Sequence, residues 1–265
     1  MHHFMTEFLN ISLSNNASIN NDIRAVCQDI IEHYKKLIPN GPPLGQKPLH
    51  VIHNPSTPRT FVNGLPHYYT IGLTTNERLY DQIAYQFAHE LSHIYCDPRI
   101  TNWFIESICE MASLYFIEYL SVKWASNPPF PNWTNYSLKY KEYKEKRIRE
   151  VENNLNITNA DEFENIFQTI LKTIDKPYER NSNTVIALKL LAIFKENSAS
   201  WKLLPLIGQS TDKILSNGSF FENSIPNFDK LVKSSTNNEK EIAKSIKKLM
   251  KKRCIIRHHK TLRRK

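Results

Sequence analysis

The segment QFAHELSHIYCDP, residues 86–98, constrains the fold of this chain more than any other stretch. Its histidines, His89 and His93, are four residues apart, so on an α-helix both imidazoles lie on one face, one turn apart. In that position both rings can bind the same tetrahedral metal ion. Glu90 would lie about 100° around the helix from His89, where it can hold a metal-bound water without binding the metal. The segment therefore predicts both a helix and a metal site.

The residues around this segment are typical of a helix. Asn76 can cap the first turn, and Glu77 follows within that turn. Asp97 precedes Pro98, and a residue before proline avoids helical backbone angles, so we expect the helix to end there. An apolar stripe at a spacing of four residues connects the two ends and consists of Leu79, Ile83, Phe87 and Leu91.

A zinc ion in a catalytic site takes three protein ligands, so a third ligand is expected outside this segment. The next segment, residues 100–120, has apolar residues at helical spacing, with Glu106 and Glu110 four residues apart among them. Because an unpaired charge is costly to bury, two carboxylates on a core-facing stripe indicate one metal ligand and one group that orients a histidine. The alternative is that one or both point to solvent or pair with Arg99 or Lys123.

The sequence HELSH followed by IESICEMASLYFIEY resembles the active-site helices of the gluzincin metallopeptidases, which include the thermolysin-like enzymes. The resemblance covers residues 87–119 only. It implies a zinc ion (Zn2+) bound by His89, His93 and Glu106. The connection between His93 and Glu106 is shorter than in thermolysin-like enzymes, so Glu110 stays open as the third ligand.

The same resemblance implies roles for the residues beside the ligands. Glu90 would be the general base, and Glu110 would hydrogen-bond His89. Enzymes of this family usually recruit a Tyr or His from a later segment to stabilise the oxyanion, and Tyr178, with Arg180 nearby, is the candidate in this chain. The alternative for Tyr178 is a surface loop without a catalytic part.

The cysteines allow a different metal site. Cys96 follows His93 by three residues and Cys109 lies in the next expected helix, so these two thiols could close a structural Cys2His2 site with His89 and His93. Such a site would leave Glu90 and the two later glutamates without a role. Small apolar core residues are the more common fate of free cysteines, and we favour that interpretation.

The chain as a whole predicts an α+β fold. Residues 19–38 have a helical apolar face, and the stretches 48–54 and 67–74 predict strands, with Asn63-Gly64 as a turn between extended pieces. The strand at 67–74 directly precedes the His-Glu-x-x-His helix. In the zincin pattern an edge strand at this place aligns an extended substrate by main-chain hydrogen bonds. An ordinary internal strand is the alternative.

The proline-rich stretch NPPFPNW, residues 127–133, is the expected domain boundary. Beyond it, the strongly charged residues 136–153 predict a solvated helix, and helical segments are expected at 161–174, 183–196 and 200–208. We therefore expect a zincin-like N-terminal domain of a small sheet and active-site helices at 1–127, a helical subdomain that completes the cleft at 134–230, and a basic tail, partly helical or disordered, at 231–265.

Positive charge is concentrated at the end of the chain. The formal net charge is +9, but residues 240–265 hold 12 Lys and Arg residues against one Glu, so the remainder is close to neutral. Ile242, Ile246, Leu249 and Met250 place an apolar side on this basic stretch. Such a tail can dock on nucleic acid, an anionic membrane or another polyanion. A solvated terminus is the alternative.

Two functions are compatible with these features. The first is a zinc-dependent peptidase that hydrolyses a peptide or protein substrate through a metal-activated water, with Glu90 as general base. The alternative is a non-catalytic or regulatory binding protein on a zincin scaffold, with the tail docking on a polyanion. No uninterrupted apolar run reaches the roughly eighteen residues of a membrane helix, and the first residues do not resemble a signal peptide, so we expect a cytoplasmic protein without a transmembrane segment.

Overall fold

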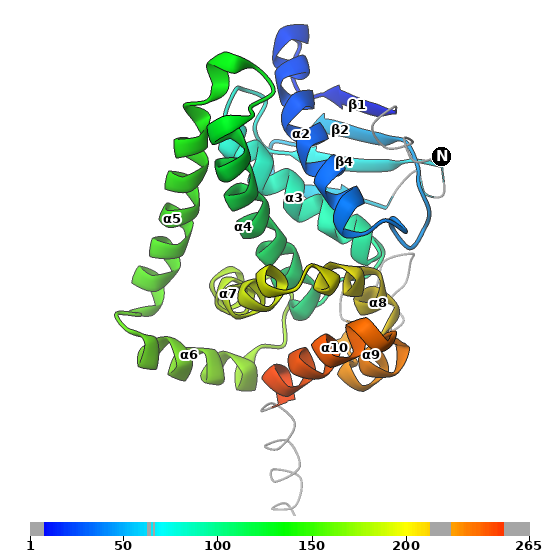
Figure 1. Ribbon diagram of the computed structural model, residues 1–265, viewed down its shortest axis with the longest axis vertical. Coiled ribbons are helices and arrows are strands. Elements are labelled where there is room, and N and C mark those ends of the chain that lie inside the picture. Colours follow the sequence, from blue (N-terminus) through cyan, green and yellow to red (C-terminus); the bar gives the residue numbers. More distant parts are fainter. Residues whose placement is uncertain (1–7, 63–64, 66, 213–223, 252–265) are drawn as a thin grey trace, which may run out of the picture.

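The N-terminal half of the chain forms a four-stranded β-sheet with helices packed on it (Figure 1). The computed structural model describes residues 8–62, 65, 67–212 and 224–251. The strands are β1 (Leu9–Ser12), β2 (Leu49–His53), β3 (Arg59–Phe61) and β4 (Tyr69–Leu73), in the order β1-β2-β4-β3. β1, β2 and β4 are parallel, whereas β3 pairs antiparallel with β4 at the edge. The strands predicted at 48–54 and 67–74 are confirmed, and the predicted Asn63-Gly64 turn lies outside the described residues.

One face of the sheet is buried by helices. Side chains alternate between the faces of a strand, and burial follows this period: Leu49 and Val51 of β2 are fully buried, as are Tyr69 and Ile71 of β4. Helix α2 (Ala17–Leu37) connects β1 to β2, because two parallel strands need a crossover between them. It packs against β1 and helix α3, and its apolar face is buried, as its sequence predicts.

Helix α3 (Tyr80–Cys96) carries the His-Glu-x-x-His segment and packs against β3 and β4. It ends before Asp97, as predicted, but it begins at Tyr80, so the predicted cap at Asn76 is wrong. The preceding turn is instead held by tertiary contacts: Arg78 donates hydrogen bonds to Asp22 and Ser18 of α2. These contacts to another element override the local capping preference.

Helix α4 (Trp103–Ser126) follows after a short loop and is capped by Asn102, whose side chain accepts hydrogen bonds from the backbone of Phe104 and Ile105. It runs antiparallel to α3, because Glu106 lies beside His93 while Ser113, two turns later, donates to the Tyr85 carbonyl. Every residue from 103 to 114 is buried. A helix that is buried on all sides lies in the centre of a fold, so any charge it carries must find its partners inside the protein.

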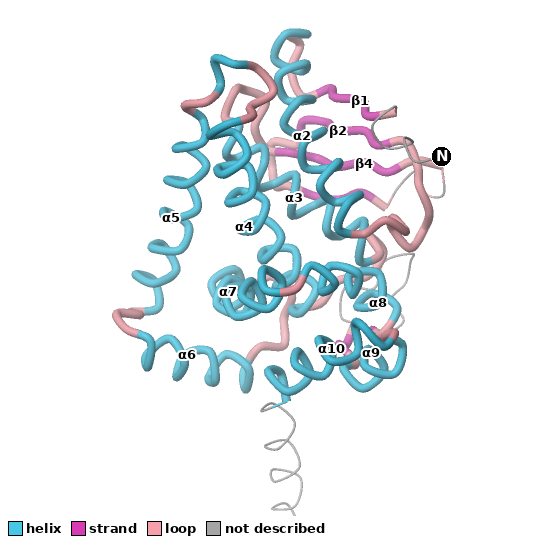
Figure 2. Tube along the Cα trace, in the orientation of Figure 1, coloured by secondary structure: helices cyan, strands magenta, loops and turns pink. Residues whose placement is uncertain are grey.

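The C-terminal half is helical, and Figure 2 shows the strands of the sheet gathered at one side of the molecule. Its helices are α5 (Tyr136–Leu155), α6 (Ala160–Thr173), α7 (Arg180–Glu196), α8 (Leu203–Gln209), α9 (Phe228–Ser234) and α10 (Asn237–Met250). Two 3-10 turns, η1 (Pro131–Trp133) and η2 (Ser198–Lys202), and a short pair of strands, β5 (Thr211–Asp212) and β6 (Ile225–Pro226), connect them. The predicted α+β class with a small sheet is confirmed.

The hydrophobic core is shared by both halves of the chain. Helix α4 packs against α5 and α7, so the break at 127–133 forms the turn between α4 and α5 and the same core extends across it. Helix α8 packs against the end of α3 so closely that a Cβ on Gly208 would lie 1.5 Å from the Cys96 carbonyl oxygen. Within the expected basic tail, α10 packs on α9 and η2 with Ile242, Ile246 and Met250 buried, so its first part belongs to the folded body. Residues 252–265 of that tail lie outside the described residues.

Candidate metal centre

Two histidines of α3 and one glutamate of α4 meet at the contact between these helices. Glu106 Oε2 lies 3.2 Å from His89 Nε2, and its Oε1 lies 3.5 Å from His93 Nε2. Nitrogen and oxygen ligands lie about 2.0 to 2.1 Å from a tetrahedral zinc, so two such ligands are separated by about 3.3 to 3.4 Å. Each Glu106 oxygen is therefore about as far from one histidine nitrogen as two ligands of one zinc ion would be from each other.

Glu106 is fixed from outside this triad by a buried hydroxyl. Thr101 Oγ1 donates a 2.8 Å hydrogen bond to Glu106 Oε1, the oxygen that faces His93. Burial alone would raise the pKa of Glu106, but the charge of His93 and the hydrogen bond from His89 lower it to about 2. The alternatives from the sequence do not hold: Glu106 is buried, Arg99 pairs with Asp97, and Lys123 pairs with Asp29.

The acidic neighbours of His89 raise the pKa of its imidazole. Burial would lower its pKa, but the hydrogen bond to Glu106 and the charges of Glu106, Glu90 and Glu110 raise the pKa of His89 to about 9. In the metal-free protein at neutral pH, His89 and Glu106 are therefore an imidazolium–carboxylate pair. A metal ion must displace the His89 proton, so metal affinity should increase with pH.

Glu110 faces the other nitrogen of the His89 ring. Its Oε2 lies 3.9 Å from His89 Nδ1, which is longer than a hydrogen bond. Its Oε1 accepts hydrogen bonds from the Tyr85 hydroxyl and from Thr184 Oγ1, the latter at 2.9 Å, and lies 4.0 Å from the buried Arg147 guanidinium. Glu106 thus approaches both histidines, whereas Glu110 approaches one and is held by groups away from the ligand atoms. This geometry favours Glu106 as the third ligand and Glu110 as an orienting group.

Glu90 is buried beside the histidines and points toward the edge strand. Its carboxylate Oε2 lies 2.9 Å from Thr60 Oγ1 of β3, and the same hydroxyl lies 2.8 Å from the Glu90 carbonyl oxygen. Thr60 therefore fixes Glu90 and connects β3 to α3 at the level of the site. No pattern near Thr60 in the sequence indicates this contact, because the two residues are 30 positions apart.

The site opens into a cleft of about 960 Å³. Its lining includes β3, the histidines and glutamates of α3 and α4, Tyr143 of α5 and the start of α7. The strand at the cleft is therefore β3. The expectation that the strand at 67–74 is the edge strand is wrong, because β4 lies between β2 and β3. Three residues of β3 are too few to show a strand period in the sequence.

The predicted oxyanion residue lies at the same cleft. Tyr178 precedes α7, is 63% exposed and lines the cleft together with Arg180 and Asn183. The connection between the helices predicted at 161–174 and 183–196 is shorter than expected, since α7 begins at Arg180. The structure thus brings Tyr178 to the cleft that contains Glu90 and the histidines.

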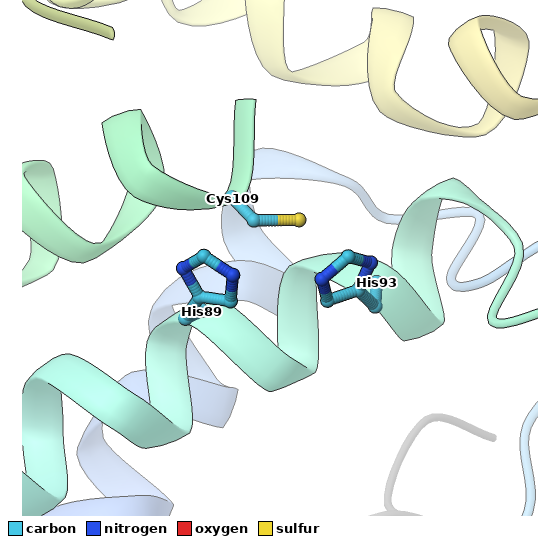
Figure 3. A group of neighbouring side chains, drawn as sticks. All are labelled: His89, His93 and Cys109. Carbon is cyan, nitrogen blue, oxygen red and sulfur yellow. The ribbon is translucent and has the colours of Figure 1, made fainter. Parts of the chain in front are cut away.

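The two neighbouring cysteines differ in their relation to the site. Cys109 lies between the two imidazole rings in Figure 3, and its sulfur and one nitrogen of each of His89 and His93 lie within 4.8 Å of one another. Among the described residues, this group of mutually close ligand atoms includes neither Cys96, which is buried on α3, nor Glu106. The Cys2His2 alternative is therefore not assembled. Glu106 contacts the histidines at 3.2 and 3.5 Å, and its carboxylate is charged, so we favour it over Cys109 as the third ligand.

Comparisons with other proteins add no further constraint. No protein-family model, curated protein or solved structure matches this chain. In the part of the chain that the structure describes, no helix is long and apolar enough to span a membrane. The function must therefore be argued from the site.

Proposed function

We propose that the protein is a zinc-dependent peptidase whose metal is bound by His89, His93 and Glu106. The contacts of Glu106 with both histidines, beside the buried Glu90 and within the lining of an open cleft, are the observation that supports this proposal most strongly. The ligand set of two histidines and one carboxylate suits a catalytic zinc site, which keeps a fourth position open. The resemblance of residues 87–119 to gluzincins points to the same chemistry.

Bound zinc supplies a Lewis acid that lowers the pKa of a water molecule and polarises the scissile carbonyl. Glu90 accepts the proton of the attacking water and later delivers it to the leaving amine. Thr60 holds the Glu90 carboxylate in position for both transfers. Glu110 orients the His89 ring through Nδ1, and Tyr178 at the rim of the cleft donates a hydrogen bond to the developing oxyanion.

The substrate would be an extended peptide or protein segment aligned along β3. This strand is last in the sheet order, so its outer backbone N–H and C=O groups are not paired within that sheet. It also lines the cleft that contains the ligands. Main-chain hydrogen bonds to such an edge bind many sequences in one register and place a peptide bond beside the metal.

The second candidate function is a regulatory binding protein on the same scaffold. The observation in its favour is α10, whose buried apolar face anchors a strongly basic stretch to the folded body. Within α10, Lys244 and Lys247 pair with Glu241 and Asp229 on the surface, so part of this charge is already partnered. A polyanion, with nucleic acid as one example, would be the partner of the charge that remains.

Glu90→Gln distinguishes the two functions. The substitution removes the proton acceptor but keeps the shape, so zinc content should equal that of the wild type while hydrolysis of casein or a peptide library is lost. Glu77→Gln, the same exchange at an exposed position before α3, is the matched control and should change neither quantity. Full peptidase activity in Glu90→Gln, or no chelator-sensitive activity in the wild type on any peptide of the library, would contradict the catalytic proposal.

A further inference from the structure

Cys109 occupies a place in the metal centre that the peptidase mechanism leaves unused. It is fully buried on α4, three residues after Glu106, so it lies about one turn further along the helix on a neighbouring face. Figure 3 shows its side chain directed between the His89 and His93 rings. Its sulfur and the two ring nitrogens lie within 4.8 Å of one another.

This arrangement is close to what a sulfur ligand requires. With zinc–sulfur and zinc–nitrogen bonds of about 2.3 and 2.0 Å, a tetrahedral ion separates these atoms by about 3.5 Å. A small side-chain adjustment of Cys109 would reach that distance, because the three side chains already converge. Glu106 lies outside this group of mutually close ligand atoms but contacts both histidines from α4. If the ion kept Glu106 as well, the thiolate would complete four protein ligands, and such a tetrahedral ion has no position left for water.

We infer that Cys109 is a fourth protein ligand of this centre and competes with water for the open position of the metal. This inference rests on the proposed metal site. When the metal–sulfur bond forms, the metal–water bond breaks, and the thiol proton leaves with that water. When water returns, Cys109 takes up a proton, and no oxidation state changes. The centre therefore has a closed form with Cys109 bound and an open form that can hydrolyse peptides.

Co2+ replaces zinc in such sites and reports sulfur ligands directly. We would load the full-length metal-free protein with Co2+ and record its near-ultraviolet absorption, because a thiolate bound to Co2+ gives an intense charge-transfer band. The wild type should show this band, and Cys109→Ser and Cys109→Ala should lose it. Cys96→Ser is the matched control, since Cys96 is equally buried on α3 but lies outside the cluster, and it should keep the band.

Zinc affinity provides the second readout. Loss of one ligand should weaken zinc binding at least about tenfold in Cys109→Ser while one equivalent still binds at higher metal concentration, because His89, His93 and Glu106 remain. Peptidase activity at saturating zinc should then be higher than in the wild type, since the closed form can no longer form.

The outcomes separate this inference from the proposed function. Cobalt binding to the wild type without the sulfur band, or loss of the band in Cys96→Ser but not in Cys109→Ser, overturns the role of Cys109 and leaves the zinc peptidase proposal intact. Failure of folded wild type and folded Cys109→Ala alike to bind Co2+ or Zn2+ overturns both.

Discussion

At the scale of single residues, Glu106 and Glu110 differ in what they contact. Glu106 lies 3.2 and 3.5 Å from the two histidines, whereas Glu110 lies 3.9 Å from one of them. We therefore expect Glu106→Gln to lose zinc at micromolar metal, and Glu110→Gln to keep it with affinity or turnover reduced by about 10- to 100-fold. Zinc titrations of the two variants by competition with a chromophoric chelator measure this order. The reverse order would make Glu110 the ligand.

His33 provides a pH prediction outside the site. Its ring stacks on Tyr119 at 3.8 Å, and burial together with the charges of Lys36 and Lys123 lowers its pKa to about 4. The pKa of His33 is lower in the folded state than in the unfolded chain. Protonation of His33 therefore favours the unfolded chain. The contribution of neutral His33 to the free energy of unfolding is fully present above about pH 6.5 and decreases as the pH falls toward about 4.

Urea unfolding of the wild type and His33→Gln at pH 7.5 and pH 4.5 tests this prediction. Glutamine does not titrate in this range, so the variant should lose less unfolding free energy between the two pH values than the wild type. The difference between the two proteins removes the contribution of the other titrating groups. Equal losses in both proteins would mean that protonation of His33 is not coupled to folding.

At the scale of elements, the sequence predicts structure best where an apolar pattern repeats over several helical turns. Helices α2, α3 and α4 extend over many turns, so their apolar patterns and the spacing of His89, His93 and Glu106 predict which residues converge. Tyr85 could also have been found, because it precedes His89 by four residues and shares its helix face. The first residue of α3 could not be predicted from the sequence, because Arg78, just before it, is held by Asp22 of the distant helix α2.

Other parts of the site come from distant segments without a local signal. Thr60 belongs to a strand of three residues, and Thr184 and Arg147 approach Glu110 from α7 and α5. These contacts depend on how α5 and α7 pack on α4, which no short pattern specifies. The proposed ligands were therefore predictable from the sequence, whereas Thr60, Thr184 and Arg147, which hold the glutamates from other elements, were not.

Helix α10 gives a prediction at the same scale. Removal of residues 252–265 should leave the melting temperature unchanged and weaken retention on heparin, because it removes basic residues without removing a described core residue. Removal from residue 237 onward should lower the melting temperature as well, since Ile242, Ile246 and Met250 are buried against the fold. Thermal unfolding and heparin chromatography of both truncations provide the measurements. Equal melting temperatures for the two truncations would show that α10 does not stabilise the body.

At the scale of the whole molecule, the cleft joins the two halves of the chain. Its lining includes β3, α3 and α4 from the first half and Tyr143, Tyr178, Arg180 and Asn183 from the second. The common core holds these elements together. In the proposed peptidase, the position of a substrate over the metal would depend on the packing of α5 and α7 on α4, as well as on the proposed ligands.

The metal content of the purified protein tests the central claim most directly. Plasma mass spectrometry of the wild type and of His93→Ala, both expressed with zinc and passed through a desalting column, gives the number of zinc ions per chain. We expect about one zinc per wild-type chain and almost none in His93→Ala after desalting, because the substitution removes one of the two histidines on which both Glu106 and Cys109 converge. A wild-type protein without zinc, or equal zinc in both proteins, would contradict a metal centre built on His89, His93 and Glu106.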